Sequence, residues 1–89
     1  MNMNKKEFYE VVRSEGLDKY NIGDFQEATK FANVIGYIND GDWGVYETNE
    51  RGAYYVIEKY ASEEAAIEGL LFELRNKKRK DDVFEKLNR

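Results

Sequence analysis

Two short turn signals that follow one another closely constrain this chain's fold more than any other feature. The first is Asn39-Asp40-Gly41-Asp42 and the second is Asn49-Glu50-Arg51-Gly52. Asp-Gly between apolar runs is typical of a tight hairpin turn, and Gly52 suits a backbone position with positive φ. The segments around the turns, 31–38, 43–48 and 53–60, are rich in strand-forming residues. Two tight turns in succession predict three sequential antiparallel strands, a β-meander.

A helix is predicted before this meander, over residues 5–15. Asn4 is placed to cap its start, and Gly16 suits the left-handed residue that commonly ends a helix. The apolar positions recur at helical spacing. They are Phe8, Val11 and Val12.

A second helix is predicted after the meander, with Ser62 as its cap and acidic residues in its first turn. Its stripe consists of Ile67, Leu70, Leu71 and Leu74, and we expect it to cover one face of the sheet. After Leu74 the periodicity changes, so that Val83 and Leu87 would fall on the opposite side of a continuous helix. We therefore expect a bend or fraying near 75–80 and a loose terminal turn or contact segment over 81–89.

The pattern as a whole predicts an α+β fold, with an N-terminal helix, an antiparallel meander of three to four strands and a C-terminal helix packed on the sheet. The fourth strand would be a short one at Tyr20-Asn21-Ile22, ended by Gly23. Asp24 followed by Glu27 resembles a capping box for a helical turn over 25–28. An irregular approach to the first long strand is the alternative for 18–30.

The chain's length fits one domain over 1–89, with a core over about 5–75 and a tail over 76–89. The chain contains no Cys, which excludes disulfides and favours a reducing cytoplasm for a domain this small. The sequence contains no apolar run of membrane-spanning length and no apolar stretch of a signal peptide. We expect a cytoplasmic protein that does not contact a membrane.

The residue inventory argues against catalysis. The chain has no His and no Cys, so the usual nucleophile with a His base cannot be built. The carboxylates of Asp40, Asp42, Glu47 and Glu50 cluster around the hairpins, where acids usually form turns and carry solvated charge. Asp40-Gly41-Asp42 lacks the remaining ligands of a calcium loop. We expect no enzyme, no metal site and no cofactor.

Aromatic residues are the best functional candidates, because seven Tyr, five Phe and one Trp exceed what so small a core needs. Strand alternation separates Trp43 and Glu47 from Tyr46, and one layer of helices would leave the second face exposed. Rings beside acids suit recognition of a basic protein. Alternatively, the helices and 18–30 together cover both faces. The contact residues that we predict are Trp43, Tyr46, Glu47, Glu50, Arg51 and Tyr54.

Charge is distributed unevenly along the chain. Residues 1–60 carry seven Lys or Arg against eleven Asp or Glu, a net charge of −4, whereas 61–89 are neutral with seven of each. An acidic body disfavours nucleic acid as the main partner. The one basic run, 75–80, either contacts phosphates or complements the negative end of the helix dipole. Asp81 and Asp82 directly after it weaken its field, which favours the second interpretation.

The run from Gly41 to Gly52 resembles a segment of the immunity proteins of bacterial polymorphic toxin systems, also called contact-dependent inhibition systems. In these proteins a G-x-W-x-V-Y strand leads into an E-R-G turn, and a later strand ends in S-E-E-A at the start of a closing helix, as Ser62-Glu63-Glu64-Ala65 does here. Tyr20-Asn21-Ile22-Gly23 also resembles the segment after their first helix. The resemblance covers about 5–74, and the helix-like 24–33 and the basic tail depart from it.

The resemblance implies a cytoplasmic protein that binds one cognate toxin domain, often a nuclease, in a 1:1 complex and blocks it by occlusion. The matching residues mainly explain the fold, so the predicted contacts depend on the exposure argument above. Two alternatives stay open: a phage- or host-encoded inhibitor or regulator of another enzyme, and a nucleic-acid accessory protein that uses 75–80. An exposed sheet edge would also allow two copies to pair.

Overall fold

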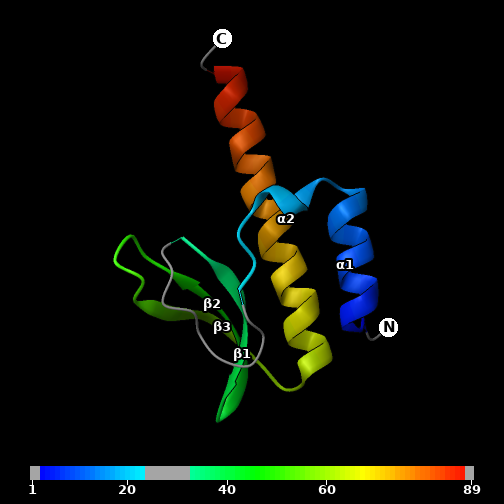
Figure 1. The fold of residues 1–89 in the computed structure, drawn as a ribbon, viewed down its shortest axis with the longest axis vertical. Coiled ribbons are helices and arrows are strands. Elements are labelled where there is room, and N and C mark those ends of the chain that lie inside the picture. Colours follow the sequence, from blue (N-terminus) through cyan, green and yellow to red (C-terminus); the bar gives the residue numbers. More distant parts are fainter. Residues whose placement is uncertain (1–2, 24–32, 88–89) are drawn as a thin grey trace.

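A computed structural model describes residues 3–23 and 33–87, except for the side chain of Asp40. The predicted α+β architecture is confirmed (Figure 1). Its elements are, in order, helix α1 (Lys5–Ser14), the short 3-10 helix η1 (Leu17–Lys19), strands β1 (Ile35–Asp40), β2 (Asp42–Thr48) and β3 (Tyr54–Tyr60), and helix α2 (Glu63–Leu87).

The three strands form one antiparallel sheet in the order β1-β2-β3, as the two turn signals predict. The first turn is tighter than expected, because Asp40 and Asp42 pair directly and Gly41 alone reverses the chain at a φ of 83°. Asn39 and Asp40 therefore belong to β1 and not to the turn. β1 begins at Ile35, whereas the predicted strand begins at residue 31.

The second turn is held by the side chain of Asn49. Its Oδ1 accepts hydrogen bonds from the backbone N–H groups of Arg51 at 2.9 Å and Ala53 at 3.1 Å. Gly52 adopts the predicted positive φ, at 82°. An Asn side chain that replaces a backbone acceptor in this way is a common turn device, and here it fixes where β3 begins.

The two edges of the sheet differ. Ile22 forms a single parallel bridge with Ile35, and the Ile35 N–H donates to the Asn21 carbonyl at 2.9 Å, so the 21–23 segment lies along β1. The short strand predicted at Tyr20-Asn21-Ile22 is thus one bridge. β3 forms the other edge, with a register shift opposite Val45 and Tyr46. The helical turn predicted over 25–28 lies outside the described residues.

The predicted ends of α1 are confirmed. Asn4 Oδ1 accepts from the Glu7 N–H at 2.9 Å, and Gly16 is left-handed with a φ of 70°. α2 is likewise capped by Ser62, whose Oγ accepts from the Ala65 N–H at 3.2 Å. Both caps satisfy N–H groups that have no partner within the helix.

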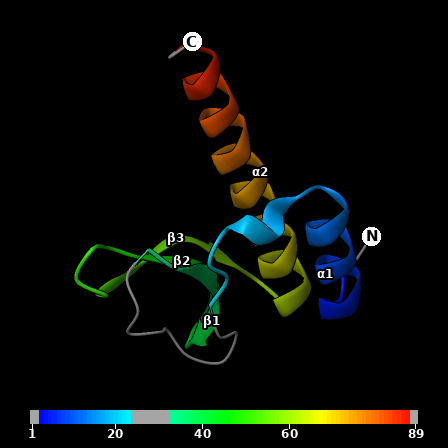
Figure 2. The same ribbon diagram turned by 45° about the horizontal axis from the view of Figure 1, so that its top comes forward.

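The core lies between the sheet and α2, which packs across one sheet face, while α1 packs against α2 and η1 (Figures 1 and 2). The close approach of Tyr60 to α2 depends on Gly69, since a β-carbon there would collide with the Tyr60 ring and hydroxyl. The largest fully buried side chains are Phe8, Val12, Leu17, Tyr37, Val45, Tyr46, Ile67, Leu70 and Leu74.

The bend predicted near 75–80 is wrong, because α2 is one continuous helix from Glu63 to Leu87. Leu74 is its last buried residue, and Val83 and Leu87 are exposed. The C-terminal third of α2 therefore projects beyond the sheet and α1 (Figures 1 and 2). Among the described residues, no helix has the length and apolar character needed to cross a membrane.

Candidate functional site

An open groove lies beside the turn between β2 and β3. It encloses about 710 Å³ of solvent-open space. Three of the six predicted contact residues, Glu47, Glu50 and Arg51, line this groove together. The full lining is Asn33, Glu47, Thr48, Asn49, Glu50, Arg51 and Tyr55.

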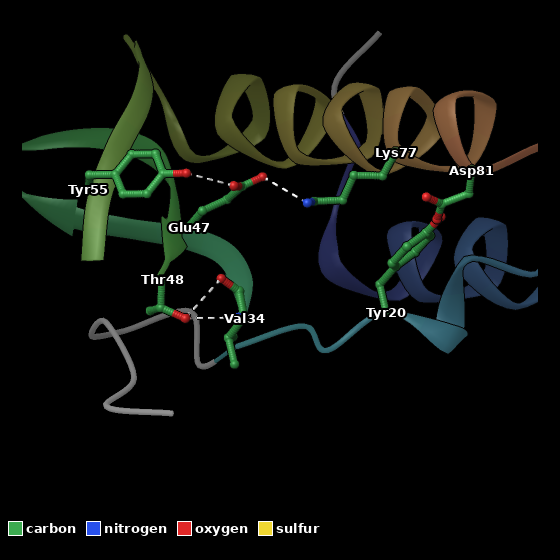
Figure 3. A network of polar contacts seen from close by, with 7 residues as sticks. All are labelled: Tyr20, Val34, Glu47, Thr48, Tyr55, Lys77 and Asp81. Atoms are coloured by element: carbon green, nitrogen blue, oxygen red, sulfur yellow. Dashed lines mark hydrogen bonds and ion pairs between the residues drawn. The ribbon is translucent and has the colours of Figure 1, made fainter. Parts of the chain in front are cut away.

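The Glu47 carboxylate, which lines this groove, is held by Tyr55 and Lys77 (Figure 3). One oxygen accepts a hydrogen bond from the Tyr55 hydroxyl at 2.9 Å, and the other lies 3.1 Å from Lys77 Nζ. The hydrogen bond to Glu47 raises the pKa of Tyr55 above its ordinary value of 10.0. β2, β3 and α2 each contribute one of these three side chains, and the carboxylate is therefore held in one orientation.

A second, smaller recess of about 350 Å³ adjoins the groove through Asn33, Glu47 and Thr48, and it is also lined by Tyr20, Asn21, Val34, Ile35 and Lys77. The Thr48 hydroxyl accepts from the Val34 N–H at 2.8 Å and lies 3.4 Å from the Val34 carbonyl, to which it donates. Tyr20 donates to Asp81 at 2.5 Å (Figure 3). The lining is mostly polar and mixed in charge, which suits a polar side chain of a partner.

β3 adds exposed apolar surface to the groove. Tyr54, Tyr55 and Val56 are 44%, 52% and 38% exposed, although each is paired with β2. Tyr55 lies on the Glu47 side, whereas Tyr54 contacts the Tyr46 ring edge to face, with a centroid distance of 6.1 Å. β3 therefore presents rings on both sides of one sheet edge.

The exposure expected for Tyr46 is wrong. This side chain is fully buried, and its ring lies against Gly36, where a β-carbon would meet Tyr46 Cε1 at 3.0 Å. The ring also reaches Gly23, so the segment after η1 helps to cover this face. Two glycines make room for an aromatic side chain that the alternation pattern alone places at the surface.

Trp43 lies at the far end of β2, away from the groove. It is partly buried against the core, and its ring centroid is 6.0 Å from that of Tyr37. Trp43 and Tyr46 thus serve packing in this chain. The exposed part of the predicted surface consists of Glu50, Arg51 and Tyr54, and Glu47 beside them is partly buried.

The basic run on α2 is largely engaged with the chain itself. Arg75 forms a bidentate contact with the Glu15 carboxylate, in which its Nε and Nη2 donate to the two oxygens at 2.8 and 2.5 Å. Lys78 donates to the Glu15 carbonyl at 3.0 Å, and Lys77 contacts Glu47. The contact with Glu15 raises the pKa of Arg75, and the reciprocal contact lowers that of Glu15. Three of the five cations are thus directed at the protein body.

Sequence reasoning missed Tyr55, Lys77 and Tyr20 as parts of this surface. Tyr55 had a usable signal, because the second turn sets a register in which Tyr55 faces Glu47. No sequence signal pointed to Lys77 or Tyr20, since their positions depend on how α2 crosses the sheet.

The fold and surface define a small α+β protein whose described surface carries a polar groove bordered by an aromatic strand edge. Comparison with protein-family models, with curated proteins and with solved structures gave no match.

Proposed function

We propose that this chain is an immunity protein, which binds a cognate bacterial toxin domain in the cytoplasm and neutralises it by occlusion, without catalysis. The observation that carries the proposal is the groove at the β2–β3 turn, where the half-exposed Tyr55 lies with Glu47, Glu50 and Arg51. Tyr54 and Val56 extend the exposed apolar surface on the other side of the same strand. Exposed Tyr at the centre of a patch is typical of residues that dominate binding energy. The resemblance of residues 41–52 and 62–65 to immunity proteins gives the class of partner.

The chemistry of the groove favours a basic partner in a 1:1 complex, and a nuclease domain fits this description. Glu47 is already oriented by Tyr55 and Lys77, so a partner cation reaching it avoids part of the usual cost of ordering a side chain. The excess of acids over bases in residues 1–60 would attract a basic surface over longer distances and speed association.

An inhibitor or regulator of another enzyme, encoded by a phage or by the host, would use the same surface and differs only in the partner. A nucleic-acid accessory role is less well supported, because Arg75, Lys77 and Lys78 contact Glu15 and Glu47. Arg79 and Lys80 are exposed and could still contact phosphates. Pairing of two copies through the β3 edge is a further alternative.

The test is capture of the partner by the tagged chain from its native bacterium at moderate salt, followed by mass spectrometry and a toxicity assay. We expect one stoichiometric protein partner whose expression stops growth unless the chain is co-expressed. Recovery of nucleic acid alone, or of a protein whose expression is harmless, would contradict the proposal.

Point variants then locate the surface. We expect Tyr54→Ala and Glu50→Lys each to weaken binding of the purified partner about 30-fold or more. Phe72→Ala is the matched control, since Phe72 is a comparably exposed ring on α2. A loss of affinity for Phe72→Ala alone would place the interface on α2 instead.

A further inference from the structure

The projecting part of α2 lacks the feature that usually keeps a helix folded. Tertiary packing of an apolar face supplies most helix stability in proteins, but no described residue after Leu74 is buried. Val83, Phe84 and Leu87 are 51%, 66% and 79% exposed. The helix nevertheless continues through Leu87, so something other than core packing holds it.

Like-charge pairs weaken the helix in this part, although most of its residues are Lys, Arg, Glu and Leu, which favour a helix. Arg75 and Arg79 are like charges four residues apart, as are Asp81 and Glu85, and such pairs oppose the helix. Glu85 also lies in the last turn, near the negative end of the helix dipole, where an acid is unfavourable. Among the described residues after Arg79, Asp82 and Lys86 form a pair of opposite charge in the favourable orientation.

Contacts from three other elements converge on two turns of α2, residues 75–81. Glu15, at the end of α1, binds Arg75 through its carboxylate and Lys78 through its carbonyl. Glu47 of β2 binds Lys77. Tyr20, directly after η1, donates to Asp81 at 2.5 Å (Figure 3).

We propose that these contacts form a latch that decides whether α2 is helical beyond its core. With the latch closed, residues 82–87 continue the helix and present Val83, Phe84 and Leu87 on a rigid rod. With the latch open, the helix ends near Leu74 while the folded body persists. The inference is independent of the proposed function, because it concerns order within the free chain.

The decisive variant leaves α2 itself unchanged. It combines Glu15→Gln, Tyr20→Phe and Glu47→Gln, so that any change in α2 comes through the lost contacts and not through altered helix propensity. We expect amide hydrogen exchange of residues 79–87 to quicken about tenfold, because several surface contacts are lost together. The exchange of β1 and β2 amides should stay within about twofold of the unmodified chain.

The matched control, Glu10→Gln with Glu50→Gln, removes the same charge from exposed positions outside the latch, and it should leave α2 unchanged. Three results would overturn the inference: slow exchange of 79–87 in the triple variant, fast exchange of 79–87 already in the unmodified chain, or equal loss of protection in the strands and in 79–87.

Discussion

Close contact between Gly69 and Tyr60 sets the distance between α2 and β3, and two opposing effects decide the outcome of Gly69→Ala. Alanine favours a helix over glycine by about 1 kcal/mol. The new methyl, however, would overlap the Tyr60 ring, and overpacking costs about 1–3 kcal/mol. We expect net destabilisation of about 1 kcal/mol by urea unfolding. Adding Tyr60→Leu to Gly69→Ala should remove the clash and restore stability. If Gly69→Ala alone were more stable than the original chain, the close contact between Gly69 and Tyr60 would be contradicted.

Glu15 gives the chain a defined dependence on acid. Hydrogen bonding to Arg75 lowers the pKa of Glu15 below its ordinary value of 4.5, so the contact stabilises the fold above that value and is lost as the pH falls through the lowered pKa. Unfolding of the original chain and of Glu15→Gln should therefore differ at neutral pH and converge at strongly acidic pH. The effect is small because the pair is half exposed. A difference that stays constant with pH would assign the effect to another cause.

At the scale of elements, Thr48 joins the start of β1 to the end of β2. Its hydroxyl is buried and accepts from the Val34 N–H. Thr48→Val would leave that N–H without this acceptor, at a cost of about 1–3 kcal/mol, whereas Thr48→Ser keeps the hydroxyl. We expect urea unfolding to show a clear loss of stability for Thr48→Val and a smaller loss for Thr48→Ser. Equal losses for both would indicate that the methyl group matters and the hydrogen bond does not.

Elements governed by local chemistry were predictable from the sequence. The Asn4 and Ser62 caps, Gly16 and the turn at Gly52 all appear where their residue types predict. These signals act over three or four residues, so distant parts of the chain do not change them. The first turn was predicted two residues too long before Gly41 and one residue too long after it, because Gly41 alone reverses the chain where two turn residues are usual.

The end of α2 and the position of Tyr46 were mispredicted for a shared reason. Apolar periodicity stops at Leu74, and polar contacts from Glu15, Tyr20 and Glu47 leave no periodic trace in the sequence. Similarly, strand alternation gives the face of Tyr46 but not the space that Gly23 and Gly36 leave for it. Of the candidate site, the turn residues were predictable, whereas the partners of Glu47 on β3 and α2 required the tertiary structure.

At the scale of the whole molecule, packing and binding are divided between regions. α2 buries the core against one face of the sheet, and α1 packs on α2 and η1. The β2–β3 turn and β3 keep rings and carboxylates at the surface. This division explains how a chain of 89 residues can retain an exposed aromatic edge without losing its fold.

The most direct test of the account is amide hydrogen exchange of the chain alone and in complex with its captured, growth-arresting partner. We predict that new protection is concentrated in residues 47–58, around the groove and along β3. Protection confined to α1 or to residues 75–87, with β3 unchanged, would contradict the claim that this edge is the binding surface.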